Sequence, residues 1–270
     1  MNLHESDVIA NGIRLHVYHT DTGKTPLVFT HGITDNGLCF SPIAAQLEDE
    51  FEIILYDSRG HGKSEAPQAK ANTFDRAQDL AGLIHALGLS KPCLIGHSMG
   101  AVTVMLFAGL YPQLPGRIVL EDPPPFEMLA SVTEESLAAR RQWRAFAAAN
   151  KQKSIDQLIA QNRKDSPAWL EAERLPWAQS KQQYSLTVFD EGPVDLTLAK
   201  QTTSQITCPA LLLTADLLKG AMYPSALADD LVASLPSATH THIPGAGHNI
   251  RRDQPAAFLQ AVRSFLQGSV

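Results

Sequence analysis

Short apolar segments alternate with longer segments in which apolar residues recur at helical spacing, over most of the chain. The short segments are rich in aliphatic and β-branched residues, which is typical of buried strands. They lie at residues 26–30, 51–56, 92–95, 117–121, 209–214 and 239–243. The segments with the helical pattern lie at residues 40–47, 73–87, 101–110, 223–235 and 254–266. Strands that alternate with helices predict an α/β fold, with a mostly parallel sheet and helices on both faces.

A β-hairpin pattern precedes these segments. Asn11-Gly12, a dipeptide favoured in two-residue hairpin turns, separates the apolar pair Val8-Ile9 from the alternating segment 13–18. With the six later strands, the hairpin predicts a sheet of eight strands.

The interval from residue 123 to residue 202 breaks the alternation of strands and helices. It opens with three prolines, which neither a helix interior nor a central strand accommodates, and it contains no strand pattern. We therefore divide the chain into an α/β core of residues 1–122 and 203–270 and a helical cap of residues 123–202, inserted after the sixth strand.

Helix starts within this cap are indicated by capping patterns. Ser131 with Glu134, and Ser154 with Gln157, have the spacing of a capping box, in which each side chain bonds the other residue's backbone N–H. Pro167 suits the first turn of a third helix, where no N–H is needed.

Composition excludes several classes of function. The chain has 270 residues, 44% of them hydrophobic, and a net charge of -6 without a basic block, so nucleic acid and anionic membranes are not expected partners. The N-terminus lacks the pattern of a signal peptide, and no apolar segment is long enough to span a bilayer. The three cysteines are widely spaced, so we expect a reduced, cytoplasmic protein, either a monomer or a homodimer.

The segment Gly96-His-Ser-Met-Gly100 carries the strongest chemical signal. It has the form Gly-x-Ser-x-Gly and lies between an apolar strand and the helical segment 101–110, as a nucleophile elbow requires. Ser98 would occupy a strained turn that exposes its hydroxyl, and a Cβ at Gly96 or Gly100 would collide with a neighbouring strand or helix. The sequence therefore predicts Ser98 as a catalytic nucleophile.

A serine nucleophile needs a base, and His248 is the candidate. It follows the last strand after a glycine-containing turn, which places it at the loop edge of the sheet. His240 and His242 alternate within that strand and share a face, but no third ligand has suitable spacing, so we expect no metal site.

An oxyanion hole needs two backbone N–H groups beside the nucleophile. One is expected from Met99, directly after Ser98. The other is expected from Ile33, in the loop after the third strand, where Gly32 lets the backbone turn sharply.

Four motifs in order, His31-Gly32, residues 57–64, Gly96–Gly100 and Gly247-His248, resemble the α/β-hydrolase fold superfamily over nearly the whole chain. Ser98 favours its esterase and lactonase branch, because dehalogenases and epoxide hydrolases carry Asp there. The resemblance implies catalysis without a metal or organic cofactor. It also implies that Asp57, at a strand end, has a structural role.

The triad acid departs from the commonest pattern of that superfamily, which places it after the seventh strand. There Leu218 occupies the expected position and Asp216 lies two residues early. A minority of members place the acid after the sixth strand, where Asp122 lies 122 - 98 = 24 residues beyond Ser98. Adjacent strand residues face opposite sides, so only one of Glu121 and Asp122 can face the site. We favour Asp122, with Asp216 and Glu121 as alternatives.

These residues predict a serine hydrolase that cleaves an ester or lactone with an apolar part. A carbon–carbon bond hydrolase or cofactor-free lyase would use the same triad, and a ligand-sensing protein of slow turnover would also keep it. We expect two or three of the aromatic residues of the cap to contact the substrate. The candidates are Trp143, Phe146, Trp169, Trp177, Tyr184 and Phe189.

Overall fold

The computed structural model describes residues 1–67 and 71–268, which form an eight-stranded sheet in the order β1-β2-β4-β3-β5-β6-β7-β8. The strands are β1 (His4–Ala10), β2 (Ile13–His19), β3 (Pro26–Thr30), β4 (Glu52–Tyr56), β5 (Cys93–His97), β6 (Arg117–Glu121), β7 (Ala210–Ala215) and β8 (Ala238–Ile243). The β1–β2 and β2–β4 pairs are antiparallel and the remaining pairs are parallel. The predicted sheet, including its hairpin, is therefore confirmed.

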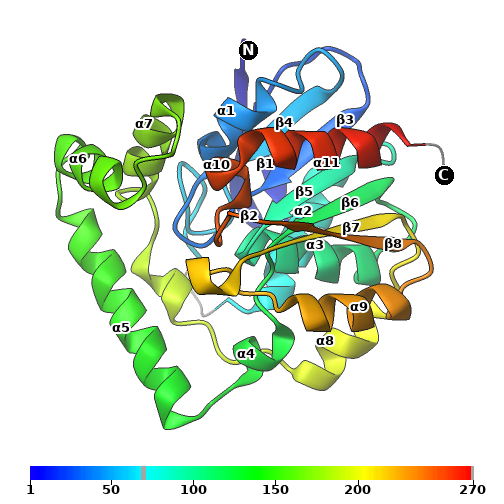
Figure 1. Cartoon of the computed structure of the whole chain (residues 1–270). Coiled ribbons are helices and arrows are strands. Elements are labelled where there is room, and N and C mark those ends of the chain that lie inside the picture. The colour runs from blue at the N-terminus through cyan, green and yellow to red at the C-terminus, as the bar shows by residue number, and fades with distance from the viewer. Residues whose placement is uncertain (68–70, 269–270) are drawn as a thin grey trace.

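Helices cover both faces of this sheet (Figure 1). The helices on one face are α2 (Thr73–Ala86), α3 (Met99–Leu110), α8 (Leu196–Thr203) and α9 (Ser225–Ser234). The other face is covered by η1 (Gly37–Phe40), α1 (Ser41–Ala44), α10 (Ile250–Asp253) and α11 (Pro255–Gln267). Along β5, Leu94 packs in the first layer, whereas Cys93 and Ile95 pack in the second. This alternation gives each strand two apolar faces, which explains why the strands read as continuous apolar segments.

Between β6 and β7 the chain forms a series of helices, and Figure 1 shows α5, α6 and α7 standing away from the sheet on one side. These elements are α4 (Phe126–Ala130), α5 (Glu134–Lys151), α6 (Ile155–Asp165), α7 (Glu171–Ser180), η2 (Leu186–Phe189) and α8. We call residues 123–202 the cap, although α8, which ends at Thr203, packs on the sheet and lies at the boundary with the core. No helix in the described ranges is long and apolar enough to cross a membrane.

Of the three helix starts predicted within the cap, one is confirmed and two are wrong. The capping box of Ser154 and Gln157 is present at the start of α6. The Ser131 prediction is wrong, because Ser131 ends α4 and the side chain of Thr133 caps α5 instead. The Pro167 prediction is also wrong. The chain turns at residues 166–169, where the Trp169 N–H donates to the Ser166 carbonyl, and α7 begins only at Glu171.

Candidate active site

Ser98 is the single residue between β5 and α3, and its backbone has φ 54° and ψ -118°. A positive φ is uncommon for a residue with a Cβ and marks a strained turn. The glycines on either side allow the helix to lie this close. A Cβ at Gly96 would meet the backbone of Ala101, and a Cβ at Gly100 would overlap the carbonyl group of Thr30. The turn therefore has the geometry that the Gly-x-Ser-x-Gly pattern predicts.

The ring of His248 lies against the carboxylate of Asp122, with 2.6 Å between Nδ1 and Oδ2. Asp122 is fully buried and also accepts hydrogen bonds from the backbone N–H groups of Met222, at 2.8 Å, and Tyr223, at 2.9 Å. Donors from two backbone groups hold the carboxylate in place. When Nδ1 donates to this carboxylate, Nε2 keeps a lone pair, as a general base requires.

The segment that carries His248 is tied to the turn that carries Ser98. His97, directly before Ser98, donates from Nε2 to the carbonyl oxygen of His248 at 2.9 Å, and the two rings lie 4.7 Å apart. Burial, with a smaller effect of the nearby Arg251 cation, holds the pKa of His97 well below its usual value. His97 therefore stays neutral and serves as a spacer between the two predicted catalytic segments.

Glu121 faces away from His248, as alternation along β6 predicts. Its carboxylate accepts from the backbone N–H of Arg251 at 2.9 Å and from the guanidinium of Arg251 at 3.1 Å. Burial raises the pKa of Glu121, and the Arg251 cation opposes this effect.

Asp216 lies at the end of β7 and contacts other groups. Its carboxylate accepts from the N–H of Gly245 at 2.8 Å and lies 3.1 Å from Nε2 of His242. Of the three candidate acids, the structure thus places only Asp122 against His248.

His240 and His242 both contact the hydroxyl group of Thr214, at 2.8 Å and 3.1 Å. Within residues 1–67 and 71–268, no group of three or more His, Cys, Asp or Glu side chains is placed to hold a metal ion. These two histidines therefore belong to the packing of β7 against β8.

The two predicted oxyanion residues, Ile33 and Met99, line the same cavity as Ser98. A contact with His61 holds the loop of Ile33 in place, because the carbonyl oxygen of Ile33 lies 2.8 Å from Nε2 of His61. A Cβ at Gly32 would lie 2.9 Å from the ring of the histidine that precedes Ser98, so glycine allows this close approach. Met99 opens α3, and the first N–H groups of a helix have no acceptor within the helix.

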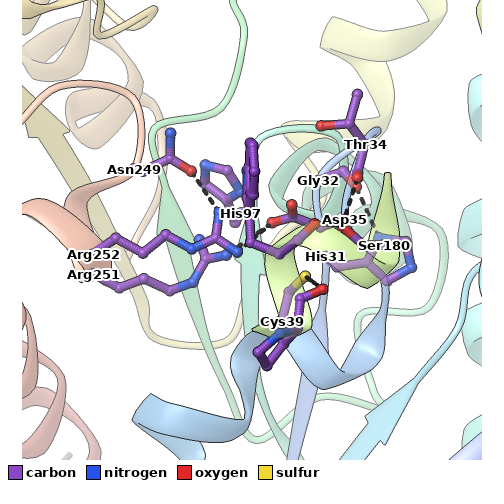
Figure 2. Close-up of polar contacts among 12 residues, drawn as sticks. His31, Gly32, Thr34, Asp35, Cys39, His97, Ser180, Asn249, Arg251 and Arg252 are labelled. Atoms are coloured by element: carbon purple, nitrogen blue, oxygen red, sulfur yellow. Dashed lines mark hydrogen bonds and ion pairs between the residues drawn. The ribbon is translucent and has the colours of Figure 1, made fainter. Parts of the chain in front are cut away.

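Behind the loop after β3 that carries Ile33, which we call the oxyanion loop after its predicted role, lies a group of buried charged side chains. Of these, the sequence analysis singled out only Glu121. We call this group the charge cluster. It consists of Asp35, Glu121, Glu173, Lys181, Arg251 and Arg252. Each of these residues is at most 4% exposed. Three cations and three carboxylates balance, and Figure 2 shows the two guanidinium groups of α10 reaching toward Asp35.

The charge cluster joins three segments around the site. Asp35, in the oxyanion loop, lies 3.0 Å from both the Lys181 ammonium, beside α7, and the Arg251 guanidinium. Lys181 also donates to the carbonyl oxygen of Thr34 at 2.7 Å. The Ser180 hydroxyl, which Figure 2 shows beside Thr34, donates to the same oxygen at 3.0 Å. Burial raises the pKa of Asp35, but the three adjacent cations outweigh burial and hold it well below the usual value. The carboxylate therefore stays charged and links the cap to the oxyanion loop.

Asp57, which the family resemblance assigns a structural role, is buried away from His248. Its carboxylate accepts from the N–H groups of Gly37 and Lys63, both at 2.8 Å, and from the Tyr18 hydroxyl at 3.3 Å. These bonds fasten the loop after β4, and burial raises the pKa of Asp57.

A cavity of about 410 Å³ opens on Ser98 between the core and the cap. Its walls are mainly apolar, and of the six cap aromatics considered, Trp143 and Phe189 line it, packed edge to face with 5.6 Å between ring centres. Trp169 points elsewhere and donates to Asp253 at 2.7 Å. The volume suits a small organic molecule.

Comparison with known proteins places this site in context. A model described as the alpha/beta hydrolase family matches residues 27–261. The esterase YbfF of Escherichia coli is 28% identical over 264 residues, which cover 94% of this chain and 98% of the esterase.

The 2-(acetamidomethylene)succinate hydrolase of Mesorhizobium japonicum is 40% identical over 107 residues, but these are only 39% of this chain and 38% of that protein. A crystal structure titled E-2-(acetamidomethylene)succinate hydrolase is similar over 99% of this chain and all of that one, with a TM-score of 0.81 and 26% identity.

Proposed function

Because the chain belongs to the alpha/beta hydrolase family, we propose that it is a serine hydrolase that cleaves a carboxylic ester or lactone through an acyl-enzyme on Ser98. The observation that carries the proposal is the 2.6 Å contact of His248 with Asp122, in a segment bonded to the strained turn at Ser98. A nucleophile, a base and an orienting acid are the parts that acyl transfer requires.

In the proposed reaction, the Ser98 hydroxyl attacks the carbonyl carbon of the substrate while Nε2 of His248 takes the hydroxyl proton. Asp122 holds the imidazole in the required tautomer and stabilises the imidazolium that forms. The N–H groups of Ile33 and Met99 stabilise the negative oxygen of the tetrahedral intermediate.

The intermediate collapses as the carbon–oxygen bond to the alcohol breaks, and His248 returns the proton to the departing oxygen. Water then attacks the acyl-enzyme with His248 again acting as base, which releases the acid and restores Ser98. In a lactone, the departing alcohol stays attached to the acyl group throughout, and the second step releases a single hydroxy acid.

A second candidate function is hydrolysis of 2-(acetamidomethylene)succinate itself. It is supported by the similarity to the structure of that enzyme over 99% of this chain. The same catalytic residues would serve, so the two candidates differ in substrate and in the bond that is cleaved.

The test is a panel of para-nitrophenyl esters, lactones and 2-(acetamidomethylene)succinate, assayed with wild type and Ser98→Ala. Sustained turnover of an ester or lactone that Ser98→Ala lacks supports the proposal. A single stoichiometric burst indicates a ligand sensor. Turnover confined to 2-(acetamidomethylene)succinate favours the second candidate, and turnover retained in Ser98→Ala contradicts both.

A further inference from the structure

Charge on the walls of the catalytic cavity is not balanced. The charged residues that line it are Arg76, Arg140 and Glu191. Arg76 forms an ion pair with Glu191 through Nη1. Arg140 has no carboxylate within ion-pair distance in the described ranges of the chain. Two cations and one carboxylate leave an excess of one positive charge beside an otherwise mainly apolar space.

Arg140 reaches the cavity from the face of α5 that also presents Ser136, Ala139 and Trp143 to it, at helical spacing. Its Nη2 donates to the carbonyl oxygens of Leu129, at 2.8 Å, and Ser131, at 3.2 Å. These carbonyls belong to the end of α4, where helix carbonyls lack partners and attract a cation.

One guanidinium nitrogen is therefore anchored, while Nε and Nη1 of Arg140 have no hydrogen-bond acceptor in the part of the chain that the structure describes. Both are charge-assisted donors that can bind a carboxylate oxygen, and Nη1 carries two N–H groups. Arg76 also lines the cavity, but its Nη1 pairs with Glu191 and its Nε is buried.

We propose that the cavity binds a substrate that carries a carboxylate in addition to the scissile carbonyl group, and that Arg140 is the residue that selects it. The proposal rests on the proposed function and specifies its substrate class. A single negative charge matches the single excess positive charge, and the apolar walls suit the hydrocarbon segment between the two groups. Without the Arg140 cation, moving an anion from water into this mainly apolar cavity would cost free energy.

The test compares mono-para-nitrophenyl adipate with para-nitrophenyl hexanoate, which differ only in the terminal carboxylate. Wild type should have the higher kcat/KM for the adipate ester. Arg140→Met should lower that value by about 10- to 100-fold, since a hydrogen bond to a charged group is lost, and should change hexanoate hydrolysis by less than about threefold. Arg140→Lys, which keeps the charge but not the planar guanidinium with its several donors, should fall between.

Arg141→Met is the matched control, because Arg141 is the next residue on α5 but is exposed and pairs with Glu134 instead of lining the cavity. It should leave both esters unaffected. Equal losses for both esters in Arg140→Met would show that Arg140 only fastens α5 to α4, and would overturn the proposal. If the ratio of kcat/KM for the two esters is the same in Arg140→Met as in wild type, the proposal is overturned as well.

Two further measurements keep the outcomes distinct. If Arg140→Met does not fold, added salt should still lower the preference of wild type for the adipate ester, because ions screen the attraction. If wild type hydrolyses neither ester, the ester-hydrolase proposal fails. The carboxylate site is then judged by thermal melts with adipate. Adipate should raise the Tm of wild type by more than that of Arg140→Lys, and no stabilisation of wild type would overturn the site.

Discussion

The ends of β6 and β7 each carry an aspartate one residue beyond the strand, yet their surroundings differ. Asp122, after β6, is fully buried, has φ 41°, and accepts two backbone N–H groups besides its contact with His248. Asp216, after β7, has a side chain that is 32% exposed, and it caps a turn through Gly245 and contacts His242.

The comparison shows that the path of the chain after a strand decides what its terminal carboxylate can do. At β6 the backbone turns sharply through Asp122 into three prolines, so the carboxylate is held inside. At β7 the chain continues into the short helix η3 (Leu217–Lys219), which leaves Asp216 at the surface. A buried carboxylate with fixed donors is suited to orient an imidazole, whereas a surface carboxylate is screened by water.

Of the variants that test this difference between the two strand ends, Asp122→Asn is expected to have the largest effect. The amide keeps the size of the side chain but presents a donor where His248 needs an acceptor, which favours the wrong tautomer. In a serine protease this change costs about 10⁴-fold, so we expect kcat to fall by about 10²- to 10⁴-fold. Ester turnover measures it, with a thermal melt to show that the variant is folded. A loss of less than threefold would mean that Asp122 does not orient the base.

The next effect concerns Glu121, the other carboxylate at the end of β6. Arg251→Met leaves Glu121 without its buried cationic partner and should lower the free energy of unfolding by about 3–5 kcal/mol. Urea unfolding measures it. Arg263→Met is the control, since Arg263 forms a partly exposed pair with Glu50 and should cost at most about 1 kcal/mol. Equal costs for the two variants would show that the charge cluster does not stabilise this strand end.

A pH dependence follows from the lowered pKa of Asp35, which binds the same Arg251. Its folded-state pKa is below the usual value of 3.8, so it contributes stability above that pH and loses the contribution as the pH falls through the folded pKa. Asp35→Asn should therefore be destabilising near neutral pH, and the difference from wild type should shrink below about pH 4. Unfolding curves at several pH values test this. A difference that grows on acidification would have the wrong sign.

The smallest effect is expected from Asp216→Asn. Its carboxylate is partly exposed and does not contact His248, so ester turnover should change by less than about fivefold. A loss as large as that of Asp122→Asn would show that the loop after β7 supplies the acid.

Local patterns predicted much of the fold and of the site. The hairpin turn, the strands and the turn at Ser98 depend on residues close together in the chain, as does the capping box of Ser154. Counting from Ser98 favours Asp122 as the triad acid. It does not exclude Asp216 or Glu121, because the sequence does not show the path of the chain after β6 or β7.

The rest depends on contacts between distant residues. The charge cluster joins residues 35, 121, 173, 181, 251 and 252, and no spacing in the sequence relates them. Ser131 has the spacing of a capping box with Glu134, but its carbonyl accepts from Arg140 and its N–H closes the end of α4. Tertiary contacts thus decided between two local uses of the same residue.

Labelling with a fluorophosphonate tests the central claim most directly, because the reagent reacts with an activated serine. Wild type, Asp122→Asn, Asp216→Asn and Ser98→Ala would be labelled under one condition and the modified peptide mapped by mass spectrometry. We expect stoichiometric labelling at Ser98 in wild type and at a similar rate in Asp216→Asn. Labelling should be at least about 10²-fold slower in Asp122→Asn and absent in Ser98→Ala. A label on another serine, or equal rates in the two aspartate variants, would contradict the account.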